Sequence, residues 1–108
     1  HNVEELARAV EVTLRSRPVD GMIGRNDMMA CIAMNAAIAA GYDVPGEIGV
    51  VGFDNSSISR FCSPKLTTLE MQREEISRAA IQMITEMMGG GVPGNAQFET
   101  KLIVRDST

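Results

Sequence analysis

The sequence has little of what most enzymes use for catalysis. Its only histidine is His1, at the start of the chain, so no imidazole base is available within the fold. It contains no GxSxG nucleophile elbow, no Walker loop and no GxGxxG motif. The glycines at 89–91 follow a predicted helix, whereas a phosphate-binding loop would precede one, so we interpret them as a helix stop. These absences argue against an enzyme, and we predict no catalytic residues and no cofactor.

Cysteine and clustered positive charge are also scarce. The 108 residues include two cysteines, Cys31 and Cys62, which are 31 positions apart. This spacing is not that of a metal site, and two cysteines do not make a disulfide framework, so we predict no metal and a reducing, cytoplasmic setting. The formal net charge is −4 and no run of Lys or Arg occurs, which argues against direct binding to phosphate backbones.

Long apolar stretches are absent as well. No apolar run approaches the length needed to cross a membrane and no signal peptide opens the chain, so we expect no membrane partner. A chain of 108 residues forms one domain at most, with a modest core. It starts without Met inside a predicted helix, and we interpret it as a fragment.

The hydrophobic pattern predicts an α/β fold with a parallel sheet. Short apolar runs at 20–24 and 48–53 flank a predicted helix at 27–40, which makes a strand–helix–strand unit. Because both strands are apolar on both faces, we expect helices on both sides of the sheet and therefore three layers. Further predicted elements are amphipathic helices at 3–16, with Asn2 as N-cap, and at 72–88, and strands at 64–69 and 98–104.

Polar residues follow the first two predicted strands. Asn26 comes after the first strand and Asp54 directly after the second. In open parallel sheets ligands bind at the carboxyl ends of the strands, and a carboxylate and an amide suit the hydroxyl groups of a ligand. Asn26 is equally suited to cap the following helix, and Asp54 to close an Asx-turn in the loop. Both interpretations stay open from the residues alone.

The predicted helix at 27–40 is apolar on nearly every side, and Asn35 is its main polar interruption. Such a helix is either buried on two sides within a domain or packed against a partner subunit. Its methionines and small residues suit close approach to an irregular surface. The pattern alone does not separate the two arrangements.

Three segments carry a resemblance to a known family. They are Asn-Asp-Met-Met-Ala at 26–30, Val-Val-Gly-Phe-Asp-Asn at 50–55 and Pro-Lys-Leu-Thr-Thr at 64–68. In this order and spacing they resemble the lactose/galactose-repressor (LacI/GalR) family of transcriptional regulators. The resemblance implies that this chain is the last part of the effector-binding region and has a partial periplasmic-binding-protein-like (type I) fold.

The resemblance also implies roles for individual residues. Asn26 and Asp54 match family positions that touch the effector, a sugar-like or purine-like small molecule. Met71 and Arg73 match positions that line the same pocket. The family pairs its subunits through the helix matching 27–40 and the nearby segment around Phe61. The implied homodimer interface comprises Met28, Cys31, Ile32, Asn35, Phe61 and Cys62.

The family layout implies a division of the chain. Residues 1–70 correspond mainly to the C-terminal subdomain, 71–98 to the crossover and a helix of the N-terminal subdomain, and 99–108 to a closing strand. DNA would be bound only through an N-terminal helix-turn-helix headpiece absent from this sequence. We therefore expect an exposed sheet edge at 20–24 and an uncovered apolar face on the helix at 72–88.

Two other functions remain as alternatives. A periplasmic sugar-binding protein of a transport system would have the same fold, and the segment at 64–68 favours the regulator over it. A small α/β enzyme is the third possibility, although the sequence contains no catalytic set.

Overall fold

The computed structural model describes residues 2–108 and divides the chain into two units. The first unit contains the residues up to Glu70 together with Leu102–Thr108, and the second contains Met71–Lys101. The sequence predicts divisions after residues 70 and 98, and that division stays a prediction. The assignment of the two units to the two subdomains of the family stays a prediction.

All the predicted helices and strands are present, with small shifts at their ends. In chain order the elements of the structure are α1 (Val3–Ser16), β1 (Gly21–Ile23), α2 (Asp27–Ala39), β2 (Gly49–Phe53), α3 (Ile58–Phe61), β3 (Thr67–Glu70), α4 (Arg73–Met88) and β4 (Lys101–Ile103). The N-cap of α1 is confirmed, because the N–H of Glu5 donates to Oδ1 of Asn2 at 2.7 Å. Local sequence signals therefore place the elements well.

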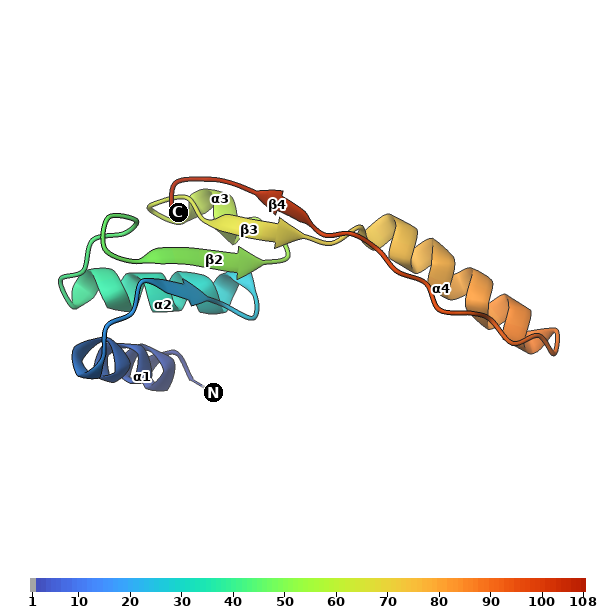
Figure 1. Ribbon diagram of the computed structural model, residues 1–108, viewed down its shortest axis with the longest axis horizontal. Coiled ribbons are helices and arrows are strands. Elements are labelled where there is room, and N and C mark those ends of the chain that lie inside the picture. Colours follow the sequence, from blue (N-terminus) through green and yellow to red (C-terminus); the bar gives the residue numbers. More distant parts are fainter. Residues whose placement is uncertain (1) are drawn as a thin grey trace. The chain divides into compact units, whose positions relative to one another are not determined.

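The four strands form one sheet in the order β1-β2-β3-β4. β1 and β3 both run parallel to β2, with Ile23 opposite Val51 and Phe53 opposite Leu69. β4 returns beside β3 in the opposite direction (Figure 1). The predicted α/β fold with a mainly parallel sheet is confirmed.

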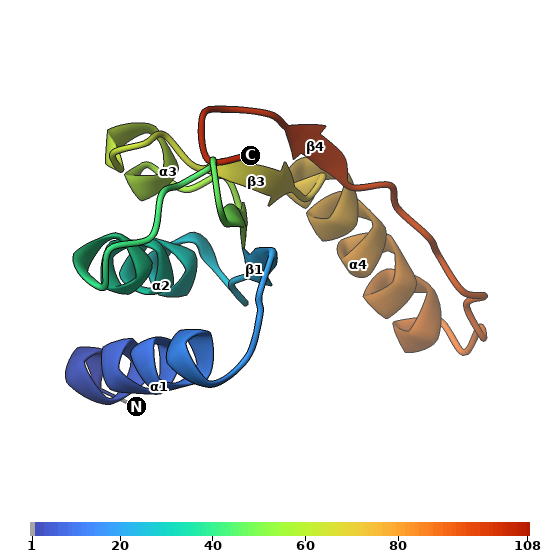
Figure 2. The same cartoon turned by 60° about the vertical axis from the view of Figure 1, so that its left-hand side comes forward.

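One face of this sheet is better covered than the other. Figures 1 and 2 show α2 and α3 on the same side of the strands, with α1 beside α2. This arrangement follows from the strand order, because successive right-handed crossovers in one direction put their helices on one face. Val50 points to that face and is fully buried, whereas Val51 and Phe53 on the opposite face are half-buried. The expected third layer is therefore not seen among the described residues of the first unit.

The core of the first unit lies between the sheet and α2. Its fully buried side chains include Met34 on α2 and Ile48 and Leu66 on the approaches to β2 and β3. Leu14 attaches α1 to this core, and its carbonyl accepts a hydrogen bond of 3.0 Å from the hydroxyl of Tyr42. The core thus fixes α1, α2 and the strands as one body.

Two apolar surfaces remain exposed, as the sequence led us to expect. Ile23 in the edge strand β1 is 80% exposed. No residue of α4 is buried, and Ile84 and Met87 on its predicted apolar face are exposed. Both surfaces are apolar, like surfaces that normally pack against another protein segment.

Truncating the central methionine of α2 should be costly. We expect Met34→Ala to lower the free energy of unfolding by about 2–5 kcal/mol, because it leaves a cavity in the core. The matched control is Met88→Ala, whose side chain is 83% exposed and whose loss should change stability by less than about 0.5 kcal/mol. Urea unfolding followed by circular dichroism measures both. Equal losses in the two variants would contradict this location of the core.

Candidate functional site

Asn26 lies between β1 and α2 and is half-buried. Its Oδ1 accepts a hydrogen bond of 2.9 Å from the N–H of Met29, so the predicted N-cap is confirmed. The cap occupies the side-chain oxygen, and the side-chain nitrogen is the atom that can donate to a ligand. Capping and ligand contact are thus compatible at this residue.

Asp54 directly follows β2 and is also half-buried. Its φ of 113° and the φ of 52° at Asn55 put two consecutive non-glycine residues at positive φ. The N–H of Asp54 donates to the carbonyl of Leu69 at 2.8 Å, which ties the turn to β3. Such backbone conformations cost free energy and concentrate at functional sites, so this turn is a candidate for one.

The sheet brings Asn26 and Asp54 to the same edge. β1 and β2 are parallel neighbours, and each residue comes after the carboxyl end of its strand. This is the edge at which open α/β sheets bind ligands. The geometry therefore agrees with the positions inferred from the sequence, while ligand contact itself stays a prediction.

Asp27 holds this edge together, a role that the sequence analysis missed. Its carboxylate is 1% exposed and accepts hydrogen bonds from the N–H of Ser56 at 2.6 Å, the hydroxyl of Ser56 at 2.9 Å and the hydroxyl of Thr68 at 2.6 Å. A Cβ on the buried Gly52 would overlap this carboxylate, so the close approach requires glycine there. One side chain thus joins α2 to the turn after β2 and to β3. The one local signal at this position is a negative charge in the first turn of a helix, which does not indicate these contacts.

Arg105 supports the same turn from the C-terminal segment, and the sequence analysis did not identify it. Its guanidinium donates to Oδ1 of Asn55 at 2.7 Å, to the hydroxyl of Ser59 at 2.8 Å and to the carbonyl of Leu66 at 2.9 Å. The side-chain amide of Asn55 in turn donates to Glu70 at 3.2 Å. A positive group from near the end of the chain therefore fixes the residue next to Asp54. No short-range pattern signals a contact between residues 50 positions apart.

Met71 and Arg73, the other predicted effector contacts, belong to the second unit. They stand at the start of α4, where the N–H of Arg73 donates to the carbonyl of Met71 at 2.9 Å. Met71 is half-buried and Arg73 is exposed. Between them, the side chain of Gln72 donates to the carbonyl of Glu99 at 3.1 Å, which joins the two ends of this unit. Their part in an effector site stays a prediction.

The six predicted interface residues divide into exposed and buried groups. Phe61 is 83% exposed and Met28 is 53% exposed, while Asn35 is exposed and Ile32 half-buried. Cys31 and Cys62 are buried inside the first unit. The exposed residues alone can therefore meet a partner directly, and the two thiols lie behind them. Their role in pairing subunits stays a prediction.

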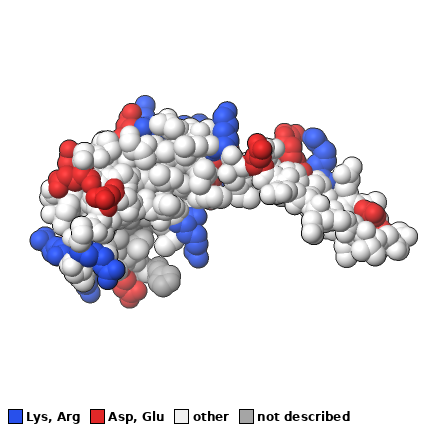
Figure 3. Space-filling view, viewed as in Figure 1, with Lys and Arg blue, Asp and Glu red and all other residues white. Residues whose placement is uncertain are grey.

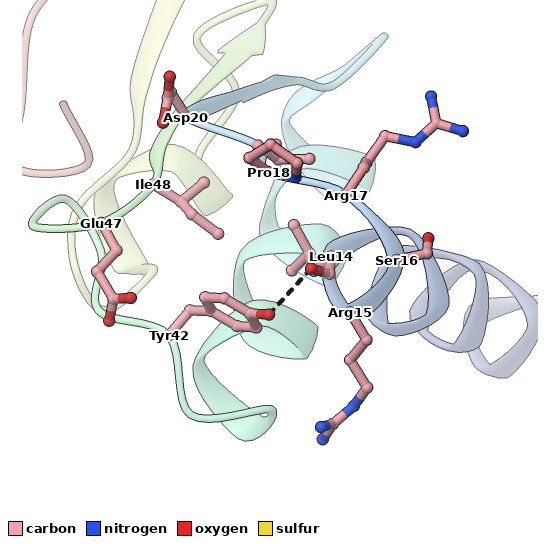
Figure 4. A pocket seen from close by; sticks show the side chains of 10 residues that line it. Leu14, Arg15, Ser16, Arg17, Pro18, Asp20, Tyr42, Glu47 and Ile48 are labelled. Carbon is pink, nitrogen blue, oxygen red and sulfur yellow. Dashed lines mark hydrogen bonds between the residues drawn. The ribbon is translucent and has the colours of Figure 1, made fainter.

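Two pockets of the first unit lie in different places. One of about 310 Å³ between α1 and α2 is lined by Asn26 and the apolar residues Val3 and Met28, and Asp54 does not line it. Another of about 590 Å³ lies at the amino ends of β1 and β2, on the opposite edge from Asp54. Figure 4 shows Tyr42 and Ile48 on one side of it and Leu14 on the other. The larger pocket is therefore not the site considered above.

Positive and negative side chains are mixed on the visible face of the molecule. Figure 3 shows Lys and Arg side chains in separate places on the visible face, with Asp and Glu side chains among them. Residues 2–108 contain no group of three or more His, Cys, Asp or Glu side chains that could hold a metal ion. Nor is any helix in the described part of the chain long and apolar enough to cross a membrane.

Comparison with known proteins decides the family. The family model described as periplasmic binding protein-like domain matches residues 1–108. The chain belongs to this family. Among curated members, the HTH-type transcriptional repressor CytR of Escherichia coli (strain K12) is 34% identical over 94 residues, which cover 85% of this chain and 28% of CytR.

Solved structures of this family agree with the fold. A LacI family transcriptional regulator from Arthrobacter sp. FB24, in complex with lactose, is 29% identical with a TM-score of 0.79, covering 100% of this chain and 42% of that one. The Lac repressor dimer bound to operator and the anti-inducer ONPF is 27% identical with a TM-score of 0.83, covering 99% of this chain and 38% of that one. The resemblance to LacI-type regulators is confirmed, and the periplasmic transport alternative is not favoured.

Removing the carboxylate of Asp27 should weaken the whole edge. We expect Asp27→Ala to lower the free energy of unfolding by about 2–4 kcal/mol, because buried donors of Ser56 and Thr68 lose their acceptor. Asp106→Ala, at an exposed position, should change it by less than about 0.5 kcal/mol. Urea unfolding compares the two, and similar losses would show that the Asp27 contacts do not hold the edge.

Proposed function

We propose that this chain is the effector-binding and dimerising part of a cytoplasmic transcriptional regulator of the LacI type. The observation that carries the proposal is the placement of Asn26 and Asp54 at one carboxyl edge of a parallel sheet, in a chain of this family. The chain spans 28% of the length of CytR, so control of DNA would act through a helix-turn-helix outside this sequence.

The effector is a small molecule rich in hydroxyl or N–H groups, such as a sugar or a purine. Asp54 accepts two hydrogen bonds from such groups and donates none, and Asn26 adds a donor. Lactose bound to the Arthrobacter regulator supports a sugar as the first class to test. Met71 and Arg73, at the start of α4, are the other two residues proposed to contact the effector.

The dimer forms through the exposed surface of α2 and the end of α3. Met28, Ile32 and Asn35 lie on α2, and Phe61 ends α3. Large apolar side chains that are more than half exposed are the groups that an interface core buries. The Lac repressor, which was solved as a dimer on its operator, supports a dimeric regulator.

Effector binding controls DNA affinity only if the effector favours one conformer over another. A ligand with equal affinity for both arrangements of the subdomains would shift nothing. Asn26, Asp54 and Arg73, the residues proposed to contact the effector, are the groups whose contacts with it would have to differ between conformers. The coupled step is therefore effector binding itself, without a catalytic reaction.

Replacing Asp54 should remove the response to effector. In the longer protein that carries this chain and its DNA-binding segment, we expect Asp54→Ala to weaken effector affinity by about 10- to 100-fold, because a charged acceptor is lost. Operator affinity without effector should stay within about twofold. Fluorescence anisotropy of operator DNA, with sugars and nucleosides added singly, measures both quantities. Asp106→Ala is the matched control, and a normal response of Asp54→Ala would exclude Asp54 from the site.

A charge on α2 should prevent pairing of subunits. We expect Met28→Glu to raise the dimer dissociation constant by at least about tenfold, since an unpaired charge in an apolar interface costs more than about 1.4 kcal/mol. Val12→Glu is the control, because Val12 is 61% exposed on the neighbouring helix α1 and outside the proposed surface. Light scattering after size-exclusion chromatography, across a dilution series, separates the two variants. Dimers of unchanged stability in Met28→Glu would place the interface elsewhere.

A further inference from the structure

The fold brings the two cysteines of the chain together. Cys31 lies on α2 and Cys62 directly follows α3, and their exposed fractions are 9% and 8%. Both belong to the same buried cluster, where α2 and α3 pack against each other. Cys31 also acts on the Cys62 thiol, because it is among the groups that raise the pKa of Cys62. Residues 31 positions apart in the sequence thus share one place in the core.

We propose that Cys31 and Cys62 are a redox-sensitive modification site, which forms an intrachain disulfide when the chain meets a peroxide. In the first step a thiolate attacks the O–O bond of hydrogen peroxide, and sulfenic acid and water form. In the second, the other sulfur attacks the sulfenic sulfur, the S–S bond forms and a second water leaves. The two thiols together lose two electrons and two protons, and the peroxide is reduced to water.

The surroundings of the two sulfurs assign their order of reaction. The thiol of Cys62 donates to the carbonyl of Ile58 at 3.0 Å, and Cys31 Sγ accepts a contact of 3.8 Å from the side-chain amide of Asn35. Burial, together with the neighbouring Cys31 and Asp27, raises the pKa of Cys62 to about 12. Since only the thiolate attacks, Cys62 is a poor first nucleophile near neutral pH. The burial of Cys62 and the hydrogen bond of its thiol to Ile58 leave Cys31 as the thiol proposed to react with the peroxide, and Cys62 as the thiol proposed to resolve the sulfenic acid.

The disulfide would affect the surface that α2 and α3 expose. It would join α2 to α3, the two helices that present the exposed Met28 and Phe61. A cross-link between residues 31 positions apart restricts the unfolded chain, so an unstrained bond stabilises the native state. Oxidation would thus lock the relative position of two helices on one side of the sheet.

The test uses the unaltered 108-residue chain. The reduced protein is treated with hydrogen peroxide, digested without reduction and analysed by mass spectrometry, and its thermal unfolding is followed by circular dichroism. We expect a peptide that links Cys31 to Cys62 within one chain, a native spectrum, a Tm above that of the reduced protein, and full reversal by dithiothreitol. Free thiols, single oxidised cysteines without a link, a link between chains or a lowered Tm would each overturn the proposal.

Two variants test the order of the steps. In Cys62→Ser, we expect dimedone to trap a sulfenic acid on Cys31 after peroxide treatment, because no second thiol resolves it. In Cys31→Ser, trapping at Cys62 should be at least tenfold slower at pH 7. The reverse order of rates would overturn the assigned roles, and the unaltered chain still tests the disulfide if either variant fails to fold.

Discussion

The carboxylate of Asp27 is the group on which the carboxyl edge of the sheet depends. It lies at the start of α2, where the helix dipole favours negative charge, and Ser56 and Thr68 supply its hydrogen bonds. A buried charge is tolerated only when it is paired or hydrogen-bonded in this way. Because its partners come from the turn after β2 and from β3, one ion fixes the relative positions of three segments.

At this edge, residues that hold the backbone in place lie next to the residues proposed to contact a ligand. Asn26 stands beside Asp27, and Asp54 stands beside Asn55, whose side chain is held by Arg105 and Glu70. In each pair a residue that holds the frame stands next to a residue proposed to contact the ligand. The unusual backbone of Asp54 is maintained because the hydrogen bonds around it outweigh its conformational cost. A rigid frame of this kind reduces the entropy lost when a small molecule binds.

Apolar surface is distributed unevenly over the molecule. The first unit has a dense core around Met34, yet it exposes Ile23 at the sheet edge and Phe61 at the end of α3. α4 in the second unit buries none of its residues. Exposed apolar area costs about 25 cal/mol per Å² relative to burial, so these surfaces favour association.

The sequence by itself determined the order and type of the elements, because capping residues, apolar periodicity and glycine stops act within a few residues of one another. It also placed Asn26 and Asp54 at one edge, since the carboxyl ends of parallel strands meet. Only the tertiary structure decided which groups Asp27 and Arg105 bind and that the two cysteines share one buried cluster. Their partners are 29 to 50 positions away for the two charged residues, and no local pattern encodes contacts at such a distance. The one-sided cover of the sheet likewise follows from strand order, which depends on long-range pairing and not on the residues of any single strand.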